Sequence, residues 1–357
     1  MADPADNAAR DDRYVIADPA WFPEGFDPGR GEILFVATDR GQLAEQPFLD
    51  GRWDRARNPQ TRISTRSLSS RLSHTQGEKR LIWHTGFCCS TLLAKALDRP
   101  GCNLSLCEPQ ILVDIAEARR TGALSRESAP AIAQFAFFLL SRPLAAGERI
   151  TIKSSPAANS LLQHMTGGTT DPMLFLFSDC RSFLVSICKL GEDGRKYARR
   201  LFLALLADGH SQAQWPAGKL LSLSDLELAA IVWHMQIAEF RRALAGLPPG
   251  SAVSLDCDAL LAAPEECLQR LDEFFALGIG TQALRDIVAG PLFRRNAKTG
   301  EDFFDASRRR AEHDNITKAM GRDLIRIVMQ SYEICRTTPQ TAPLPHPLVP
   351  LDKNYVL

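Results

Sequence analysis

Short, largely apolar runs recur through the middle of the chain, and longer stretches with helical spacing separate them. The apolar runs lie at residues 81–84, 150–152, 173–177 and 252–255. Stretches in which apolar residues return every three or four positions, as in amphipathic helices, lie at residues 111–120, 131–140, 182–190, 226–244 and 265–275. Buried strands that alternate with helices predict a parallel sheet covered by helices on both faces.

The N-terminal part of the chain has a different pattern, with small apolar runs set among turn-forming residues. Residues 14–16 and 33–37 are apolar, and residues 22–31 between them are rich in Pro and Gly. This pattern predicts a small β-containing appendage. Residues 54–79 are polar and rich in Arg, Ser and Thr, which predicts a linker or loop.

These patterns divide the chain into four parts. The first part is acidic, alanine-rich and polar, so we expect a disordered tail. The last part is Pro-rich and is expected to be extended. The predicted boundaries are 1–12 for the first tail, 13–79 for the appendage and its linker, 80–336 for the α/β domain and 337–357 for the second tail.

Charge narrows the classes of partner. The 357 residues include 42 Lys and Arg and 42 Asp and Glu, so the formal net charge is zero. A neutral chain has no overall field with which to coat nucleic acid or an anionic membrane. We therefore expect neither as a partner, while a small local site for one anionic ligand stays open.

Cysteine usage and the N-terminal residues indicate a reducing compartment. The nine cysteines are scattered through apolar runs, with no C-x-x-C pair and no Cys/His spacing typical of zinc sites. We expect reduced, buried cysteines and no structural metal. The N-terminal residues lack the apolar core of a signal peptide, and no run approaches the ~20 apolar residues of a membrane span. A cytoplasmic protein is the expectation.

The strongest candidate for a ligand site follows the run at residues 81–84. A Gly/Cys/Ser/Thr turn comes next, and then the helical segment 92–97. Strand, tight loop and helix form the first unit of nucleotide-binding α/β folds, in which the loop backbone and the helix N-terminus hold an anion. The G-x-x-x-x-G-K-[ST] motif is absent, because the turn has a single glycine, Gly86, and no lysine. An ordinary turn in which Ser90 and Thr91 cap the helix is the alternative.

The order of motifs from about residue 80 to 275 resembles the sulfotransferase family. The family's 5′-phosphosulfate loop reads roughly Pro-Lys/Arg-Ser-Gly-Ser/Thr-Thr before an apolar helix, and residues 86–93 align with it, ending in Ser-Thr-Leu-Leu. Many carbohydrate and protein-tyrosine members then carry Glu-Pro, which is Glu108-Pro109 in this chain. A Lys on the next strand followed by a Pro is also common, and Lys153 and Pro156 fit it.

Later segments add to this resemblance. In the family, a strand ending in Arg-Asp-Pro and a Ser eight residues after the Arg contact the 3′-phosphate. Residues 175–186 take this place, with Ser186 in register. Further on, a family helix with a Trp precedes a strand and Glu-Asp-Leu-Leu-x-x-Pro, and Trp233 and residues 254–265 match that pattern.

The resemblance implies a P-loop NTPase-like three-layer α/β fold, with a central parallel sheet flanked by helices. It also implies transfer of a sulfuryl group from 3′-phosphoadenosine 5′-phosphosulfate, as co-substrate, to a hydroxyl or amine of a small-molecule or peptide acceptor, without a metal. Acceptor selection would lie at residues 116–140 and 191–223. The residues carried over as contacts of the co-substrate are Thr85, Gly86, Phe87, Cys88, Cys89, Ser90, Thr91, Arg181, Ser186 and Lys298.

Three departures from the family pattern remove cations or space at the phosphates. Phe87 replaces the loop Lys/Arg, Cys88-Cys89 replaces Ser-Gly, and Ser178 replaces the Arg of the second element. Because Arg matches phosphate geometry best, these losses weaken the expectation of this co-substrate. The candidates for replacement cations are Lys153, Arg181 and the basic segment 294–300, which contains Lys298.

Sulfuryl transfer needs a base for the acceptor's proton and cations around the charge-rich transition state. Glu108 is the predicted base, since Pro109 would hold its backbone extended at a strand end; a surface or capping carboxylate is the alternative. Lys153 is the predicted cation, unless it is a solvated strand-end lysine. His84 is predicted to bind an anion or act as the base, the alternative being a half-buried histidine bonded to a neighbouring carbonyl.

Two other functions stay open. Asp179 ends an apolar run, as does the aspartate of a magnesium-dependent NTPase or small-molecule kinase, although the missing loop lysine argues against that class. With its phosphate cations lost, the chain is alternatively a sulfotransferase fold that binds a ligand or partner without catalysis. The basic run 308–310 is interpreted as a solvated helical face, or else as a rim for an anionic acceptor.

Overall fold

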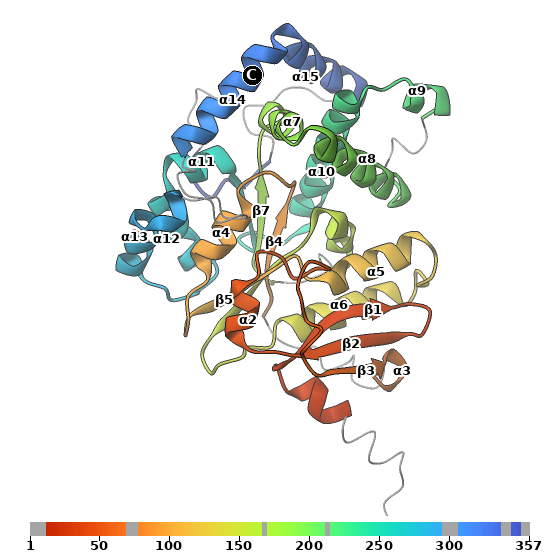
Figure 1. Ribbon diagram of the computed structural model, residues 1–357, viewed down its shortest axis with the longest axis vertical. Coiled ribbons are helices and arrows are strands. Elements are labelled where there is room, and N and C mark those ends of the chain that lie inside the picture. The colour runs from red at the N-terminus through yellow and green to blue at the C-terminus, as the bar shows by residue number, and fades with distance from the viewer. Residues whose placement is uncertain are drawn as a thin grey trace, which may run out of the picture.

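A computed structural model describes residues 12–68, 78–165, 170–210, 215–294, 306–336 and 344–350. Among these residues, the centre is a parallel five-stranded sheet in the order β5-β6-β4-β7-β8. Its strands are β4 (Arg80–His84), β5 (Asn103–Cys107), β6 (Arg149–Lys153), β7 (Met173–Phe177) and β8 (Ala252–Asp256). The predicted parallel sheet is confirmed (Figure 1).

Helices follow the strands, largely where apolar spacing predicts them. Those that cover the sheet are α4 (Ser90–Leu97), α5 (Gln110–Arg120), α6 (Ala129–Leu140), α10 (Asp225–Gly246), α12 (Pro264–Phe274) and α13 (Thr281–Ala289). The remaining helices of this part are the 3₁₀ helix η2 (Pro156–His164), α7 (Cys180–Lys189), α8 (Gly191–Ala207), α9 (Ala217–Leu221), α11 (Cys257–Ala262), the 3₁₀ helix η4 (Pro291–Arg294), α14 (Ala306–Met320) and α15 (Arg322–Cys335).

Both faces of the sheet are buried, because successive residues of each strand point to opposite sides. Leu81 and Trp83 of β4 join the hydrophobic core under α5, α6 and α10. Ile82, between them, joins a second core under α4, α12 and α13. Figure 1 shows these two groups of helices on opposite sides of the strands. The predicted three-layer α/β fold is therefore confirmed.

The strand order of the sheet reverses direction at β4. After β4 the chain forms β5 and β6 on one side, and then crosses to form β7 and β8 on the other. Open parallel sheets bind ligands beyond the carboxyl ends of their strands at such a point. The segments that directly follow these strands are thus where a site is expected.

Strand β5, which the sequence analysis places only through the strand end at Glu108, has no continuous apolar run because its core is partly polar. Asn103 and Ser105 are buried in it. The Asn103 side chain donates to the carbonyl of Leu97 (2.9 Å) and accepts from Thr151 Oγ1 (2.9 Å). Buried polar groups are tolerated when they are hydrogen-bonded, so the strand lies inside the sheet without a continuous apolar run.

The N-terminal appendage is an antiparallel sheet, as the β-containing prediction requires. Its strands are β1 (Trp21–Asp27), β2 (Glu32–Ala37) and β3 (Gln60–Ser64), accompanied by α2 (Arg40–Glu45) and α3 (Thr65–Leu68). Its apolar face lies against α5 and α6, and Phe22 and Phe26 share one core with Ile111 and Phe135 (Figure 1). The appendage and the α/β domain therefore share a hydrophobic core.

Three local predictions within the appendage are wrong. Residues 14–16 are helical, residues 60–68 hold β3 and α3 in the predicted linker, and the Pro/Gly-rich stretch contains β1. The pairing of β1 with β2 shifts register between Pro23 and Gly25, so β1 is an edge strand with a bulge. Edge strands and bulges accommodate Pro and Gly, which explains why turn-forming residues occur in a strand.

Residues 344–350 of the predicted C-terminal tail run beside β8. Ser254 N–H donates to the carbonyl of His346, and Leu348 N–H donates to the carbonyl of Ser254, both at 2.8 Å. Leu344, Leu348 and Val349 are buried. The rest of that tail, and residues 1–11 of the N-terminal tail, lie outside the described residues.

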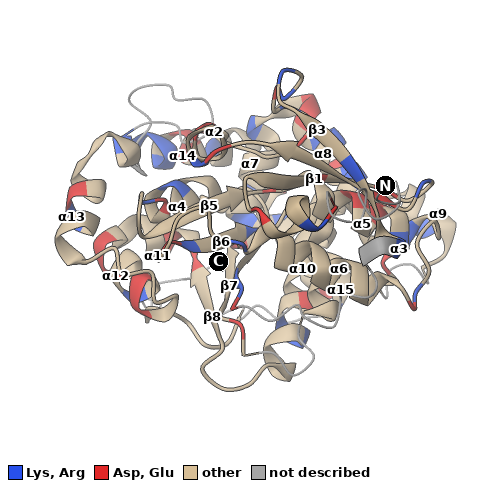
Figure 2. Cartoon of the chain, turned by 90° about the horizontal axis from the view of Figure 1, so that it is seen from below, with Lys and Arg blue, Asp and Glu red and all other residues tan. Residues whose placement is uncertain are grey.

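The charged residues of the described chain are mixed in sign. Figure 2 shows Lys and Arg interspersed with Asp and Glu over the outer helices and the small sheet. This distribution agrees with the formal net charge of zero. No helix among the described residues combines the length and apolarity that a membrane span requires.

Candidate functional site

The loop between β4 and α4 has a backbone suited to an anion. Gly86, Phe87 and Cys89 have φ values of 81°, 54° and 60°, in the left-handed region. Turns of this kind direct successive backbone N–H groups toward one side. The N-cap residue Cys89 makes no capping hydrogen bond through its side chain. The loop and the first turn of α4 thus present main-chain donors without a side-chain cap from Cys89.

Apolar side chains, rather than a cation, fix this loop in place. The ring of Phe87 lies 5.7 Å from Phe183 and 5.0 Å from Tyr197, measured between ring centroids. Cys88 is fully buried in the core under α4, and burial raises the pKa of its thiol to about 12. Cys88 is therefore a neutral packing residue. Phe87 thus packs the loop against α7 and α8, and Cys88 packs it into the core under α4.

Two of the three predicted catalytic residues form a direct ion pair, and the loop joins it. Lys153 Nζ, at the end of β6, lies 3.0 Å from Glu108 Oε1, directly after β5. The same ammonium donates to Thr91 Oγ1 in the first turn of α4 (3.3 Å). Lys153 therefore contacts both Glu108 and Thr91 at the carboxyl ends of the strands.

Lys153 is not the solvated strand-end lysine of the alternative interpretation. Its side chain is 0% exposed. Burial alone would lower the pKa of Lys153, but the Glu108 carboxylate, with a smaller contribution from Cys107, raises it above the ordinary value. The ammonium therefore stays charged inside the protein, and Glu108 is the group that compensates it.

The backbone of Glu108 differs from the extended conformation that we expect before Pro109. Its φ is +54°, in the left-handed region, which costs a non-glycine residue about 1–3 kcal/mol. Glu108 N–H donates to the carbonyl of Lys153 (2.8 Å). On the other side, Leu49 donates to the Cys107 carbonyl (2.7 Å) and accepts from Gln110 N–H (2.8 Å). These three hydrogen bonds hold Glu108 toward Lys153.

The appendage also contributes side chains that the sequence prediction missed. Phe48 lies over Lys153, whose Nζ is 5.2 Å from the ring centroid. Arg52 lies over the same ring, with its Cζ 3.7 Å from the centroid. Arg52 is half of an ion pair with Asp50, and the Glu108 carboxylate helps to raise its pKa. Phe48 and Arg52 come from the N-terminal appendage, in which the sequence analysis predicts no site residue.

His84 supports the loop. Gly86 N–H donates to its Nδ1 (3.1 Å), so the neutral ring carries its proton on Nε2. Nε2 lies 3.7 Å from Glu108 Oε1, and the His84 carbonyl accepts from Asn159 Nδ2 (3.0 Å). The ring therefore bonds a neighbouring N–H group, and not a carbonyl as in the alternative interpretation.

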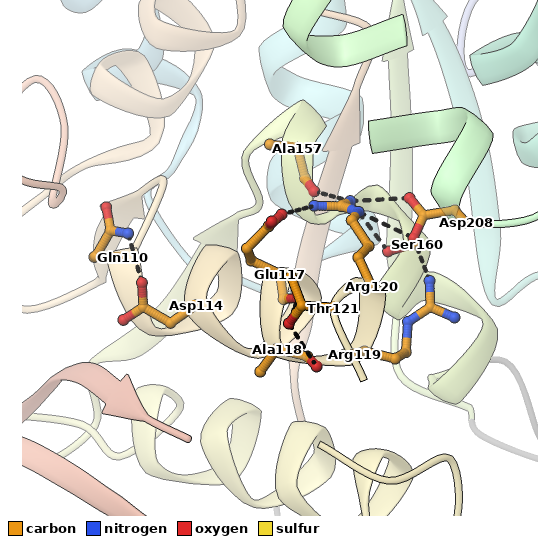
Figure 3. A network of polar contacts seen from close by, with 10 residues as sticks. All are labelled: Gln110, Asp114, Glu117, Ala118, Arg119, Arg120, Thr121, Ala157, Ser160 and Asp208. Atoms are coloured by element: carbon orange, nitrogen blue, oxygen red, sulfur yellow. Dashed lines mark hydrogen bonds and ion pairs between the residues drawn. The ribbon is translucent and has the colours of Figure 1, made fainter. Parts of the chain in front are cut away.

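A buried polar network holds η2, which carries Asn159. At the end of α5, Arg119 and Arg120 both pair with Asp208, which follows α8 (Figure 3). Arg120 also donates to the carbonyl of Ala157 and to Ser160 Oγ in η2. The network ties three elements together beside the end of β4, and it fixes the helix that contacts His84.

Those of the other residues carried over from the family that the structure describes lie outside this cluster. Arg181 is exposed in the first turn of α7. Ser186 Oγ donates to the Ser182 carbonyl one turn earlier (3.0 Å). Thr85 and Ser90 are buried in the loop and the start of α4. Lys298 lies outside the described residues.

Arg309, from the run predicted to be a solvated face, approaches the loop. Its guanidinium is 13% exposed, 2.7 Å from Asp258 Oδ1 and 3.4 Å from Cys257 Sγ. Burial alone would lower the pKa of Arg309, but Cys257, the loop residue Cys89 and Asp258 raise it. Arg309 is thus a charged group at this end of the sheet. The sequence signal was its position in a basic run.

The residues that could hold a metal lie beside this arginine. Asp256, Cys257 and Asp258 place one potential ligand atom each within 4.8 Å of the others. Asp256 accepts from Asp258 N–H as the N-cap of α11, and Arg309 already contacts the other two side chains. A helix cap and an arginine account for this cluster without a metal.

Comparison with known proteins gives one structural similarity to report. No protein-family model matches the sequence, and no curated protein matches it. The fold is similar to that of the sulfotransferase domain from the curacin biosynthetic pathway, with 14% sequence identity and a TM-score of 0.42. The similarity covers 69% of this chain and 98% of that domain.

Proposed function

We propose that this protein transfers a sulfuryl group from 3′-phosphoadenosine 5′-phosphosulfate to a hydroxyl or amine of an acceptor. One observation carries the proposal: buried Lys153 contacts both Glu108 (3.0 Å) and Thr91 (3.3 Å). A carboxylate, a cation and the start of the anion loop thereby form one cluster at the carboxyl ends of the strands. The family resemblance of the same segments supports this reading.

The proposed step conserves atoms and charge. Glu108 accepts the proton of the acceptor's hydroxyl or amine as that atom forms its bond to sulfur. The bond between sulfur and the 5′-phosphate oxygen breaks, and its electron pair leaves with the phosphate. The products are the sulfated acceptor and 3′-phosphoadenosine 5′-phosphate, and the proton then passes from Glu108 to solvent.

Lys153 has two roles in this proposal. First, the ammonium lies 3.0 Å from Glu108 Oε1 and offsets the negative charge of the proposed base. Second, the Lys153 ammonium contacts Thr91 in the first turn of α4. Its positive charge would stabilise negative charge on a leaving phosphate bound there. Lys153 thus stabilises the transition state without contact with solvent.

The loop fits an anion through its main chain more than through side-chain charge. Gly86, Phe87 and Cys89 have φ values in the left-handed region, and α4 begins directly after Cys89. Phe87 occupies the place of the family's cation and packs on Phe183 and Tyr197. We therefore expect weaker donor binding than a loop with a Lys or Arg would give.

The magnesium-dependent kinase is disfavoured by the position of Asp179. Its carboxylate accepts from Ser182 N–H (2.9 Å) as the N-cap of α7. A capping carboxylate is already used in the fold, whereas a metal-binding aspartate needs its oxygens for the ion. Binding without catalysis remains a distinct outcome of the test below.

The test is thermal unfolding with millimolar 3′-phosphoadenosine 5′-phosphate, and separately with ATP and magnesium. Binding at 100 times Kd stabilises the folded state by about 2.7 kcal/mol, which gives a clear rise in Tm. We expect a rise with the first nucleotide. The absence of that rise, or a rise with ATP and magnesium alone, would overturn the proposal.

Catalysis is tested separately with Glu108→Gln. The amide keeps the size of the side chain but cannot accept the acceptor's proton. We expect Glu108→Gln to bind 3′-phosphoadenosine 5′-phosphate like the wild type, and to lose release of this product in assays with the full donor and a panel of hydroxyl and amine acceptors. If the wild type binds the nucleotide but sulfates none of the panel, the non-catalytic reading gains support.

A further inference from the structure

The hydroxyl of Tyr197 on α8 points at the anion loop. If Gly86 carried a Cβ, that atom would lie 2.7 Å from the Tyr197 oxygen. The tyrosine ring also packs edge-on against Phe87, with 5.0 Å between centroids. Gly86 is therefore needed twice, for its φ of +81° and for the close approach of this hydroxyl. Tyr197 therefore packs closely against two residues of the loop, Gly86 and Phe87.

The Tyr197 oxygen is buried and, within the described part of the chain, has no hydrogen-bond partner. Most buried hydroxyls in folded proteins are paired, because an unpaired one costs about 1–3 kcal/mol. A phenylalanine would make the same ring contacts with Phe87 at no such cost. The oxygen is thus unfavourable for folding, which calls for a role outside folding.

The Tyr197 hydroxyl keeps its proton near neutral pH, so it can donate a hydrogen bond. Burial raises the pKa of its hydroxyl, and the negative charge of the Glu108 carboxylate raises it further. A neutral O–H donor beside a loop of main-chain N–H donors suits an anionic oxygen of a ligand. It does not suit a cationic ligand.

We propose that Tyr197 is a ligand-binding residue of this site, whose hydroxyl donates a hydrogen bond to an oxygen of the sulfate or phosphate group held by the loop. This inference deepens the proposed function and rests on it for the identity of the donor. The Tyr197 hydroxyl would supply one ligand contact from α8, in a loop that has Phe87 in place of the family's Lys or Arg. It also explains why residue 86 is glycine.

The test compares Tyr197→Phe with the wild type in two measurements. The first is thermal unfolding without ligand, where we expect an equal or higher Tm because an unpaired oxygen is removed. The second is titration with inorganic sulfate and with 3′-phosphoadenosine 5′-phosphate, where we expect affinity to fall at least about tenfold, as for a lost hydrogen bond to a charged group. A purely structural tyrosine would show the reverse, with lower stability and unchanged affinity.

Tyr332→Phe is the matched control. Tyr332 lies on α15, and its ring packs on His234 (4.6 Å) and Trp233 (6.4 Å). We expect its loss of a hydroxyl to leave the affinity for both anions unchanged. An equal loss of affinity in both variants would overturn the inference, since the effect would then not depend on contact with the loop.

The outcomes separate this inference from the proposed function. If the wild type binds sulfate but not the nucleotide, and Tyr197→Phe weakens sulfate binding, the inference stands and the sulfuryl-transfer proposal fails. If both anions bind and Tyr197→Phe binds them equally well, the inference alone is overturned. If the wild type binds neither anion, both are overturned.

Discussion

The main chain of Leu49 brackets Glu108. Leu49 donates to the carbonyl of Cys107, just before Glu108, and accepts from the N–H of Gln110, two residues after it. Leu49 belongs to the N-terminal appendage, whereas Glu108 follows β5 of the central sheet. The conformation of the proposed base therefore depends on a segment that is remote in sequence.

Removal of residues 1–68 should therefore abolish a stable, ligand-binding fold. The truncated chain loses the two hydrogen bonds around Glu108 and exposes the apolar surface of α5 and α6 that Phe22 and Phe26 cover. We expect aggregation, or a broad thermal transition without a nucleotide-induced rise in Tm. A cooperative transition with wild-type nucleotide binding would show instead that the appendage folds separately and is dispensable.

We expect substitutions of Lys153 and Glu108 to have strongly coupled effects on the free energy of unfolding, because the two side chains form an ion pair. Lys153→Met should lower the free energy of unfolding by about 3–5 kcal/mol, because a half-buried carboxylate loses its compensating charge. Adding Glu108→Gln should recover part of this loss, since the remaining group is neutral. Urea unfolding of both single variants and the double variant measures the coupling.

The exposed pair of Lys196 and Glu192 is the control for that cycle. Its atoms are 2.9 Å apart, but its side chains are 55% and 71% exposed. Lys196→Met should change stability by less than about 1 kcal/mol. Equal effects of Lys153→Met and Lys196→Met would contradict a structural role for the buried pair.

The sequence predicts the centre of the site because of how parallel sheets are built. The carboxyl ends of neighbouring parallel strands meet at one edge, where His84 ends β4, Lys153 ends β6 and Glu108 directly follows β5. β7 is predicted with its observed bounds, since it is a continuous apolar run. Local pattern suffices where the strand is uniformly buried.

Residues that reach the site from elsewhere leave no local pattern. Phe48, Tyr197 and Arg309 come from the appendage, α8 and α14, and each is defined by a tertiary contact. The left-handed φ of Glu108 is similarly imposed, because Leu49 and the Lys153 carbonyl override the extended preference before Pro109. Sequence spacing carries no information about these contacts.

The Asp208 network gives a prediction about η2. Asp208 is 3% exposed and pairs with Arg119 and Arg120 (Figure 3). Asp208→Asn leaves two partly buried arginines without this carboxylate, so we expect a loss of about 3–5 kcal/mol in urea unfolding. Glu117, which is 60% exposed and pairs with the same Arg120, is the control. Glu117→Gln should cost less than about 1 kcal/mol, and similar costs for the two variants would mean that η2 is held by other contacts.

His234 should make the protein sensitive to acid. It is buried on α10, its Nε2 lies 2.9 Å from Ser331 Oγ, and burial, helped by Arg241, lowers its pKa to about 4. Between its ordinary pKa of about 6.5 and about 4, the unfolded chain binds the proton and the folded one does not. The stability tied to neutral His234 is therefore complete above about pH 6.5 and lost as the pH falls through about 4. The total is on the order of 3 kcal/mol.

His234→Gln, which keeps a donor for Ser331, should flatten this part of the stability curve in urea unfolding at pH 7, 5.5 and 4.5. A wild-type slope in the variant would assign the acid sensitivity to other groups.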